Sequence, residues 1–226
     1  MSDPKETLAE RYAEVKASLP THVTLVAVSK TRSAEEIQAL YDLGHRDFGE
    51  NYVQELRAKQ PALPADIRWH YIGHLQRSNV KHIVPFVHLV HGVDGAPLLD
   101  ELEKRAAAAS RMIDVLLQIH IAQEETKHGL SQKEAEALIT GWSTERWPHL
   151  QLRGLMGMAT NTEDLAVVRR EFDALADFFR TMKEGCLADP ALFDTLSMGM
   201  SGDADMAIEA GSTMVRIGTA IFGERS

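Results

Sequence analysis

The stretch TLVAVSKTRSAEEIQALYDLG (residues 24–44) decides the fold, because it joins a buried strand directly to an amphipathic helix. Residues 25–28 form a short apolar run rich in β-branched side chains, which is typical of a strand buried in a parallel sheet. Ser33, with a glutamate three residues later, predicts the N-terminus of a helix. Apolar residues then recur at helical spacing until Gly44, which is predicted to end the helix. Lys30 therefore lies at the carboxyl end of a buried strand, an unusual place for an amine.

The same strand-then-helix pattern continues along the chain. Besides the first strand, we predict strands at 46–51, 67–73, 87–93, 113–121, 150–158, 193–200 and 213–223. Helices are predicted between them, so eight strands alternate with seven helices, and such an alternation implies right-handed parallel crossovers. Eight units close an α/β fold of the (β/α)8 TIM barrel type, and 226 residues is within its usual range.

Two further features bear on this fold. An extra amphipathic helix is predicted at 5–18, and it could serve as the eighth outer helix because little chain follows the last strand. The alternative fold is an open doubly wound sheet, but the glycine-rich fingerprint expected after its first strand is absent. No repeat, low-complexity segment or linker interrupts the series, so residues 1–226 are predicted to form one domain.

Composition excludes several classes of function. Hydrophobic residues make up 44% and charged residues 25%, as in an ordinary soluble globular protein. A net charge of −9 argues against a nucleic-acid partner, which requires a concentrated basic face. The chain has no run of about 18 apolar residues, so no membrane span is predicted. Its charged start is not a signal peptide and its single cysteine, Cys186, forms no internal disulfide, so we expect a cytoplasmic protein.

The last two predicted strands end in residues suited to bind a phosphate group. In (β/α)8 barrels the active site lies at the carboxyl ends of the strands, and the loops after strands seven and eight often bind phosphate. Ser201 and Gly202 are predicted at the mouth of a helix, where backbone N–H groups and the helix dipole favour an anion. Gly218 and Thr219 offer a close backbone approach and a hydroxyl. The alternative is that Ser201 only caps a helix and Gly218 only forms a turn.

Lys30 acquires a chemical role when a phosphate site lies on the same rim. A lysine opposite a phosphate site could hold a phosphorylated aldehyde as a Schiff base, and the amine must be neutral to attack the carbonyl. Its pKa must therefore be lowered by burial or by nearby cations, and Arg216 is predicted on the same rim. The alternative is that Lys30 is a rim residue held by a salt bridge.

Four long motifs extend the pattern over nearly the whole chain: LVAVSKTRSAEEIQALYDLGHRDFGENYVQEL, RWHYIGHLQ, LRGLMGM and LSMGMSGDADMAIEAGSTMVRIGTAIFGER. Together they resemble the pyridoxal phosphate homeostasis proteins. The resemblance implies a barrel like the amino-terminal domain of alanine racemase, and covalent binding of pyridoxal 5′-phosphate (PLP). It implies that Lys30 is the Schiff-base lysine. The other cofactor-binding residues that it implies are Asn51 near the ring, Arg216 at the pyridine nitrogen, and Ser201, Gly218 and Thr219 at the phosphate.

One motif departs from the family pattern. Members usually read IGxLQxNK after the third strand, whereas this chain reads IGHLQRSNVKHI. Ser78 and Asn79 replace the expected asparagine and lysine, and Lys81 is the nearest lysine that follows. The departure puts a contact at the rim in doubt and leaves the predicted Schiff base unaffected.

Arg216 favours a cofactor carrier over a catalyst. An arginine is effectively always protonated, so it donates to the pyridine nitrogen without protonating it, which weakens the electron sink that most PLP enzymes use. Alanine racemase also uses a tyrosine from a second subunit, and no tyrosine of this chain falls in a matching motif. We therefore expect a protein of PLP homeostasis, which buffers and delivers the cofactor and balances amino-acid pools, with no catalytic activity.

Two alternatives remain open. One is an enzyme, either a PLP-dependent racemase-like catalyst or a Schiff-base aldolase; the other is a non-catalytic barrel that binds another phosphate ester, with Lys30 acting only by its charge. The expected partners are the small-molecule cofactor and apo PLP enzymes as recipients, and we expect a monomer without nucleic-acid or membrane partners. The histidines show no spacing typical of zinc, so no metal site is predicted and hydrogen-bonded core or rim positions are expected for them.

Overall fold

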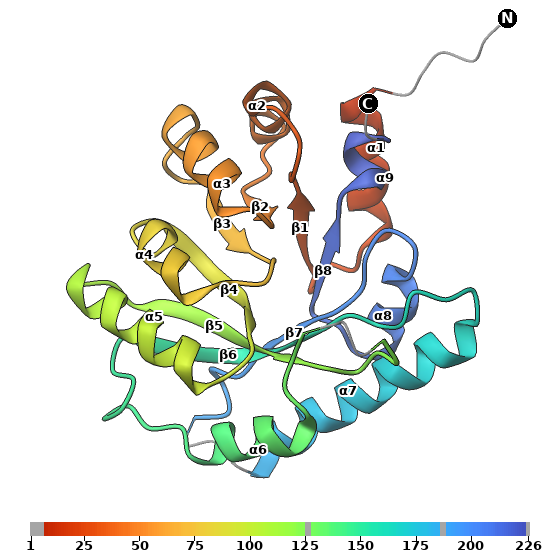
Figure 1. Cartoon of the computed structure of the whole chain (residues 1–226). Coiled ribbons are helices and arrows are strands. Elements are labelled where there is room, and N and C mark those ends of the chain that lie inside the picture. Colours follow the sequence, from red (N-terminus) through yellow and green to blue (C-terminus); the bar gives the residue numbers. More distant parts are fainter. Residues whose placement is uncertain (1–6, 125–127, 186–188, 225–226) are drawn as a thin grey trace, which may run out of the picture.

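Eight parallel strands close into a barrel in sequence order in the computed structural model, which describes residues 7–124, 128–185 and 189–224 (Figure 1). Each strand pairs with the next, and β1 also pairs with β8, where Thr24 lies beside Met214 and Ala27 beside Ile217. The (β/α)8 prediction is confirmed and the open doubly wound alternative is wrong. The strands are β1 (Thr24–Val28), β2 (Asp47–Glu50), β3 (Arg68–Tyr71), β4 (Val87–Val93), β5 (Ile113–Ile119), β6 (Leu150–Gly157), β7 (Thr195–Ser197) and β8 (Met214–Ile217).

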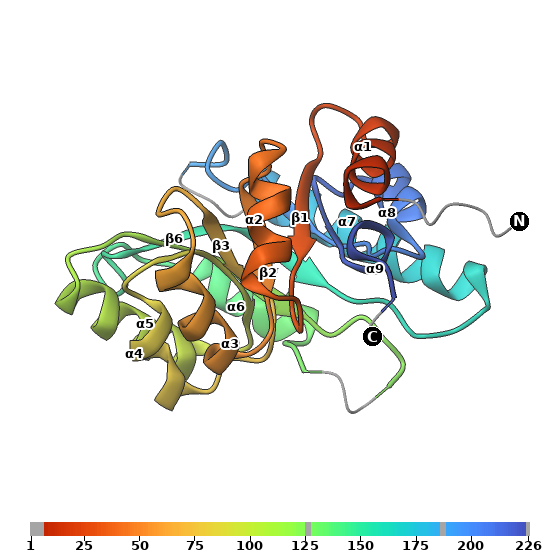
Figure 2. The ribbon, with the colours of Figure 1, turned by 90° about the horizontal axis from the view of Figure 1, so that it is seen from above.

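Helices surround the strands on the outside of the barrel (Figures 1 and 2). They are α1 (Leu8–Ser18), α2 (Ala34–Asp42), α3 (Val53–Lys59), α4 (Val80–Ile83), α5 (Ala96–Ala108), α6 (Gln132–Thr140), α7 (Leu165–Gly185), α8 (Ala204–Ala210) and α9 (Thr219–Phe222), with 3-10 turns at Gln60–Ala62 and Arg77–Asn79. The cap predicted at Ser33 is present and forms a capping box with a glutamate, and Ser131 forms a second capping box at the start of α6. No helix in the described ranges is long and apolar enough to cross a membrane. Cys186 lies outside the described residues.

The last strand is shorter than the predicted 213–223. It ends at Ile217, and Thr219–Phe222 forms a short helix, α9. Gly218, with φ −119° and ψ −70°, turns the chain out of the extended conformation. The apolar pattern continues through this turn because Ile221 and Phe222 are buried as helical residues, so the pattern does not mark where the strand ends.

The eighth outer position of the barrel is filled by two helices from opposite ends of the chain. The helix predicted at 5–18 is α1, which begins at Leu8 among the described residues. It lies beside α9 in both views (Figures 1 and 2). Arg11 Nε donates a hydrogen bond to the carbonyl oxygen of Ile221 at 2.8 Å. The prediction that this helix completes the outer ring is correct, with α9 as its partner.

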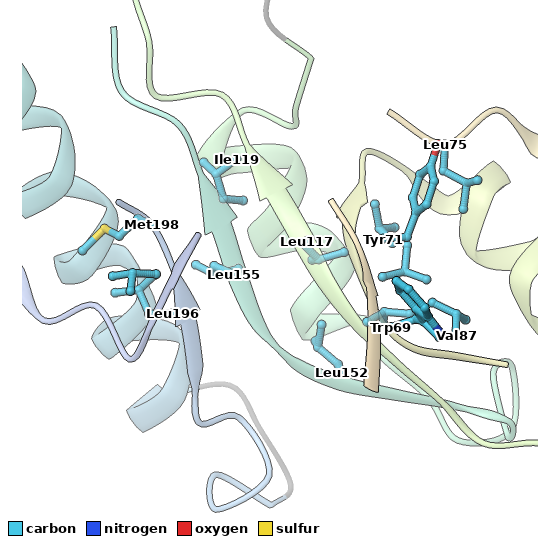
Figure 3. Packing of buried hydrophobic residues seen from close by; sticks show 14 of the residues in the cluster. Trp69, Tyr71, Leu75, Val87, Leu117, Ile119, Leu152, Leu155, Leu196 and Met198 are labelled. Carbon is cyan, nitrogen blue, oxygen red and sulfur yellow. The ribbon is translucent and has the colours of Figure 1, made fainter. Parts of the chain in front are cut away.

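The barrel has an apolar outer layer and a partly polar interior. Side chains such as Trp69, Tyr71 and Leu117 face the helices and form the main core (Figure 3). A smaller cluster of buried apolar residues packs separately from it, and its members are Val26, Leu89, Leu116, Met156 and Met214. Fully burying an apolar side chain of this size stabilises the fold by about 1.5–3 kcal/mol. Because strand residues alternate between faces, the strand neighbours of the outward residues point inward, and several of these are polar.

Candidate functional site

A cavity of about 290 Å³ opens at the carboxyl ends of the strands that surround Lys30. All six predicted site residues line it. The complete lining is Val28, Lys30, Arg32, Asn51, Ile72, Met158, Met200, Ser201, Gly202, Arg216, Gly218 and Thr219. A larger hollow of about 640 Å³ lies beside α6 and α7, but none of the predicted site residues lines it. The chemistry of the lining, rather than size, therefore identifies the candidate site.

The turn that carries Lys30 is held by a glutamate from the next βα unit. Lys30 is half-buried and follows β1 after one residue. Thr31 has a φ of 65°, a left-handed conformation that β-branched residues rarely adopt. Its N–H donates a hydrogen bond to Oε2 of Glu55 at 2.7 Å, which stabilises this conformation. The strained turn fixes where the Lys30 side chain leaves the strand.

A second lysine, buried beneath this turn, was not predicted from the sequence. The ammonium of Lys59 donates to the carbonyl oxygen of Ser29 at 2.9 Å and to carboxylate oxygens of Glu50 and Glu55, both at 2.8 Å. Ser29 Oγ also donates to Glu50 at 2.6 Å. Burial raises the pKa of Glu50, although the hydrogen bonds from Lys59 and Ser29 oppose this effect. Lys59 is the last residue of a helix, where a lysine is usually exposed, so the sequence pattern does not predict its burial.

Arg216 forms the buried wall of the cavity. Its side chain rises from β8, and the residue is only 4% exposed. Nη1 donates to the carbonyl oxygen of Ser197 at 2.9 Å and to its Oγ at 2.7 Å, and Nη2 donates to the carbonyl oxygen of Gly157 at 3.1 Å. Burial lowers the pKa of Arg216 to about 10, so it stays protonated at neutral pH. These bonds use three of the five N–H groups, and two remain for a ligand.

Two chain turns meet at the more exposed end of the cavity. Gly218 is the N-cap of α9 and Thr219 is its first residue, while Ser201 and Gly202 form the turn before α8. The alternative that Ser201 caps α8 is wrong, because Asp203 occupies the N-cap position. A Cβ on Gly218 would lie 3.2 Å from the carbonyl oxygen of Val28, so glycine lets β8 leave the barrel close to β1. The first turn of a helix offers N–H groups without intrahelical acceptors, which suits an anion.

Asn51 brings an unpaired acceptor to the cavity. Its Oδ1 is buried and has no hydrogen-bond partner among the described residues. The backbone of Asn51 is fixed, because Tyr71 Oη donates to its carbonyl oxygen at 3.0 Å. Gly73 lies so close that a Cβ there would be 2.4 Å from the same oxygen. A buried acceptor held in this way fits a ligand that donates a hydrogen bond.

The rim beside the cavity carries a cluster of three polar side chains. His74 Nδ1 lies 3.4 Å from Oδ2 of Asp94, and the ring of His74 stacks on that of His128 at 4.0 Å. Two imidazoles and a carboxylate are common ligands of divalent metal ions, and these three side chains are close enough to share one. The absence of a metal site therefore stays a prediction. Ser78, Asn79 and Lys81, where the sequence departs from the family motif, are not among the cavity-lining residues.

Comparison with known proteins decides the family. A family model described as alanine racemase, N-terminal domain, matches residues 5–226. The pyridoxal phosphate homeostasis protein of Vibrio alginolyticus is 40% identical over 221 residues, which cover 95% of this chain and 92% of that protein. The human protein of the same name is 38% identical over 233 aligned positions, which cover 98% of this chain and 82% of that protein. The chain belongs to the pyridoxal phosphate homeostasis protein family.

Solved structures agree with this family. PipY of Synechococcus elongatus is 33% identical, and the match covers 96% of this chain and all of PipY, with a TM-score of 0.89 for the form without PLP and 0.85 for the form with PLP bound. Alanine racemase of Bartonella henselae is 15% identical with a TM-score of 0.73, and the match covers 58% of that enzyme. The homeostasis family thus shares the barrel fold of the racemase.

Proposed function

We propose that this protein binds PLP in the cavity, covalently through Lys30, and acts in PLP homeostasis by buffering and delivering the cofactor. The observation that carries the proposal is that one cavity joins the Lys30 amine, the buried Arg216 guanidinium and the unpaired Asn51 oxygen. PLP offers an aldehyde, a ring nitrogen, a ring hydroxyl group and a phosphate. The names of the homeostasis proteins, and the PLP bound to PipY, support the same ligand.

Each cavity residue has a role toward one group of the cofactor. Lys30 would hold the cofactor covalently, because its amine can condense with the aldehyde with loss of water. Arg216 would donate to the ring nitrogen, and Asn51 would lie near the ring. Ser201, Gly218 and Thr219 bind the phosphate. Bound PLP supplies an electron sink for amino-acid chemistry, and a permanent cation at the ring nitrogen weakens it.

The proposal of a carrier rather than an enzyme is supported by what the lining lacks. Among the described residues that line the cavity, Lys30, Arg32 and Arg216 are the titratable ones, and no tyrosine, histidine or carboxylate accompanies them. A racemase needs a proton-transfer group on each face of its substrate. We further propose that residues 1–226 act as one domain in the cytoplasm, as a monomer, and that apo PLP enzymes receive the cofactor.

Reduction with borohydride tests the covalent site. Incubation with PLP and then borohydride is expected to add one cofactor to Lys30, located by peptide mass spectrometry. Lys30→Ala is expected to lose this adduct while its circular dichroism spectrum is unchanged, because a half-buried lysine contributes little to the core. Lys81→Ala, which changes an exposed lysine outside the cavity, is the matched control and keeps the adduct. An adduct mainly on another lysine would refute the assignment.

Exchange of amino-acid α-protons separates the carrier from the racemase-like enzyme. In deuterated water with L-alanine and other amino acids, the PLP-loaded protein is expected to exchange the α-proton no faster than free PLP, as followed by NMR. Arg216→Glu is expected to bind less cofactor but to exchange faster per bound cofactor, because a carboxylate can share a proton with the ring nitrogen. Rapid exchange by the parent protein that disappears in Lys30→Ala would instead establish an enzyme.

A further inference from the structure

A continuous line of hydrogen-bonded side chains runs through the barrel away from the cavity. Arg216 Nη1 lies 2.7 Å from Ser197 Oγ, which lies 3.1 Å from Nδ1 of His91. Nε2 of His91 lies 3.0 Å from Nδ1 of His70, and Nε2 of His70 lies 3.1 Å from Oδ1 of Asp47. Each of the five residues is buried, with exposure between 0% for Ser197 and 9% for Asp47.

The two ends of this line open on different faces of the barrel. Arg216 lines the candidate PLP cavity at the carboxyl ends of the strands. Asp47 is the first residue of β2 and lines a second cavity, of about 460 Å³, at the amino-terminal mouth. Arg68 and His88 line the same second cavity, and Arg68 Nε donates to Asp47 at 2.6 Å. Side chains from β2, β3, β4, β7 and β8 therefore connect the two mouths.

The chemistry of the end groups assigns every hydrogen along the line. A guanidinium can only donate and a carboxylate can only accept. Ser197 Oγ accepts from Arg216, so its own hydrogen goes to Nδ1 of His91. His91 then carries its hydrogen on Nε2 and donates to Nδ1 of His70, which in turn donates from Nε2 to Asp47. In this arrangement each imidazole accepts at Nδ1 and donates from Nε2, so every donor in the line has an acceptor.

We propose that Ser197, His91 and His70 are positioning residues for Arg216, and that Asp47 at the opposite mouth sets the direction of their hydrogen bonds. The inference rests on the proposed function, in which Arg216 faces the ring nitrogen of PLP. Without the carboxylate, Nε2 of His70 loses its acceptor, and only Arg216 at the other end still favours this direction of the hydrogen bonds. His91 could then carry its hydrogen on Nδ1 and donate to Ser197 Oγ, and it would compete with Nη1 of Arg216 for that oxygen. A change at the amino-terminal mouth thus alters the guanidinium that faces the cofactor.

The tautomers can be measured without the cofactor. Long-range ¹H–¹⁵N NMR of the PLP-free protein is expected to show His70 and His91 as neutral Nε2–H forms. Ser197→Ala, which removes the donor to His91, is expected to shift the Nδ1 resonance of His91. A hydrogen on Nδ1 of His91 in the unsubstituted protein would overturn the proposal, and this measurement requires no variant to fold.

Coupling between the two mouths is tested at Asp47. Asp47→Ala is expected to shift the ¹⁵N resonances of the Arg216 side chain in the PLP-free protein, and Asp47→Glu is expected to restore them in part. His88→Gln is the matched control, because His88 lines the same mouth and its ring centroid lies 5.4 Å from that of His70, while the hydrogen bonds of the line do not include it. This control leaves the Arg216 resonances unchanged. An Asp47→Ala protein whose histidine resonances shift while those of Arg216 do not would overturn the proposal.

The loaded protein supplies a second readout. The absorption maximum of the bound cofactor is expected to shift in Asp47→Ala and not in His88→Gln. If Asp47→Ala changes only the stability of the protein, the role of Asp47 is structural and the proposal is wrong. Failure to form the Lys30 adduct would refute the proposed function, and the NMR of the PLP-free protein would still decide whether the line orients Arg216.

Discussion

The residues that line the cavity are buried at one end and exposed at the other. Arg216 at the buried end is 4% exposed and carries a permanent charge. Ser201, Gly202 and Thr219 at the other end are exposed. In the proposed complex, a phosphate at the exposed end would keep part of its hydration, and the ring would lie against Arg216 at the other end. The two ends can therefore be perturbed separately.

Removal of two hydroxyls tests the phosphate end. Ser201→Ala combined with Thr219→Ala is expected to weaken binding of PLP but to leave binding of pyridoxal, which lacks the phosphate, nearly unchanged. A hydrogen bond to a charged group contributes about 1.5–3 kcal/mol, and two adjacent losses add incompletely. Affinities come from equilibrium dialysis, with Thr181→Ala, an exposed hydroxyl on α7, as the control. Equal losses for both ligands would contradict the assignment.

At the level of elements, the ends of β1 and β2 are joined by α3. Lys59, the last residue of α3, bonds to Ser29 after β1 and to Glu50 at the end of β2. Glu50 is fully buried, and its Oε2 has no partner among the described residues. A buried carboxylate held by one ammonium depends on that ammonium. The same group of bonds supports the turn that carries Lys30.

Loss of the Lys59 charge should destabilise the fold. Lys59→Met keeps most of the side-chain volume but leaves Glu50 buried without its cation, which costs about 3–5 kcal/mol. Urea unfolding followed by circular dichroism measures this loss. Adding Glu50→Gln to Lys59→Met is expected to recover part of the lost free energy of unfolding, because burying a neutral amide costs less than burying an unpaired carboxylate. Lys81→Met, on the surface of α4, is expected to change the free energy of unfolding little.

Particular elements show what the sequence could and could not predict. The strand predicted at 87–93 has those bounds in the structure, because its apolar run ends where the strand does. The strand predicted at 193–200 is only Thr195–Ser197, because Gly199 adopts a φ of 96° and turns the chain toward the cavity. The six cavity residues were predictable because strand ends meet on one face of a barrel. Lys59 was not predictable, because its burial depends on contacts between separate βα units.

At the scale of the whole molecule, the amino-terminal mouth is stabilised by an ionised carboxylate. Burial opposes ionisation of Asp47, but hydrogen bonds from His70 and Arg68 outweigh this effect and hold the pKa of its carboxyl well below the usual range. An acid with a lowered pKa in the folded state stabilises the fold at pH values above its unfolded pKa, which is about 3.9 for aspartate. This contribution is lost as the pH falls below that value.

Acid unfolding of the whole protein should reflect this group. The free energy of unfolding is expected to fall as the pH drops below about 4, and Asp47→Asn is expected to be less stable at neutral pH and to fall less steeply in acid. Urea titrations at several pH values measure both effects. Asp205→Asn, an exposed residue of α8, should leave the slope unchanged. A parallel slope for parent and Asp47→Asn would show that other carboxyls dominate.

The line of side chains inside the barrel also belongs to this scale, and the sequence could not predict it. Asp47, His91 and Ser197 lie far apart along the chain and occur in strands whose apolar pattern is ordinary. Histidines at core positions were expected, and His70 and His91 confirm this by their burial and hydrogen bonds. Their mutual contact depends on the closure and register of the barrel, which no local pattern encodes.

The pairing of β1 with β8 has a consequence for synthesis of the protein. Lys30 leaves the ribosome well before Arg216, Gly218 and Thr219, which come later in the chain. A nascent chain can therefore expose its lysine amine long before the phosphate and ring contacts exist. Under the proposed assignment, the cofactor would be held by all of these residues only after translation has passed Thr219 and β8 has paired with β1.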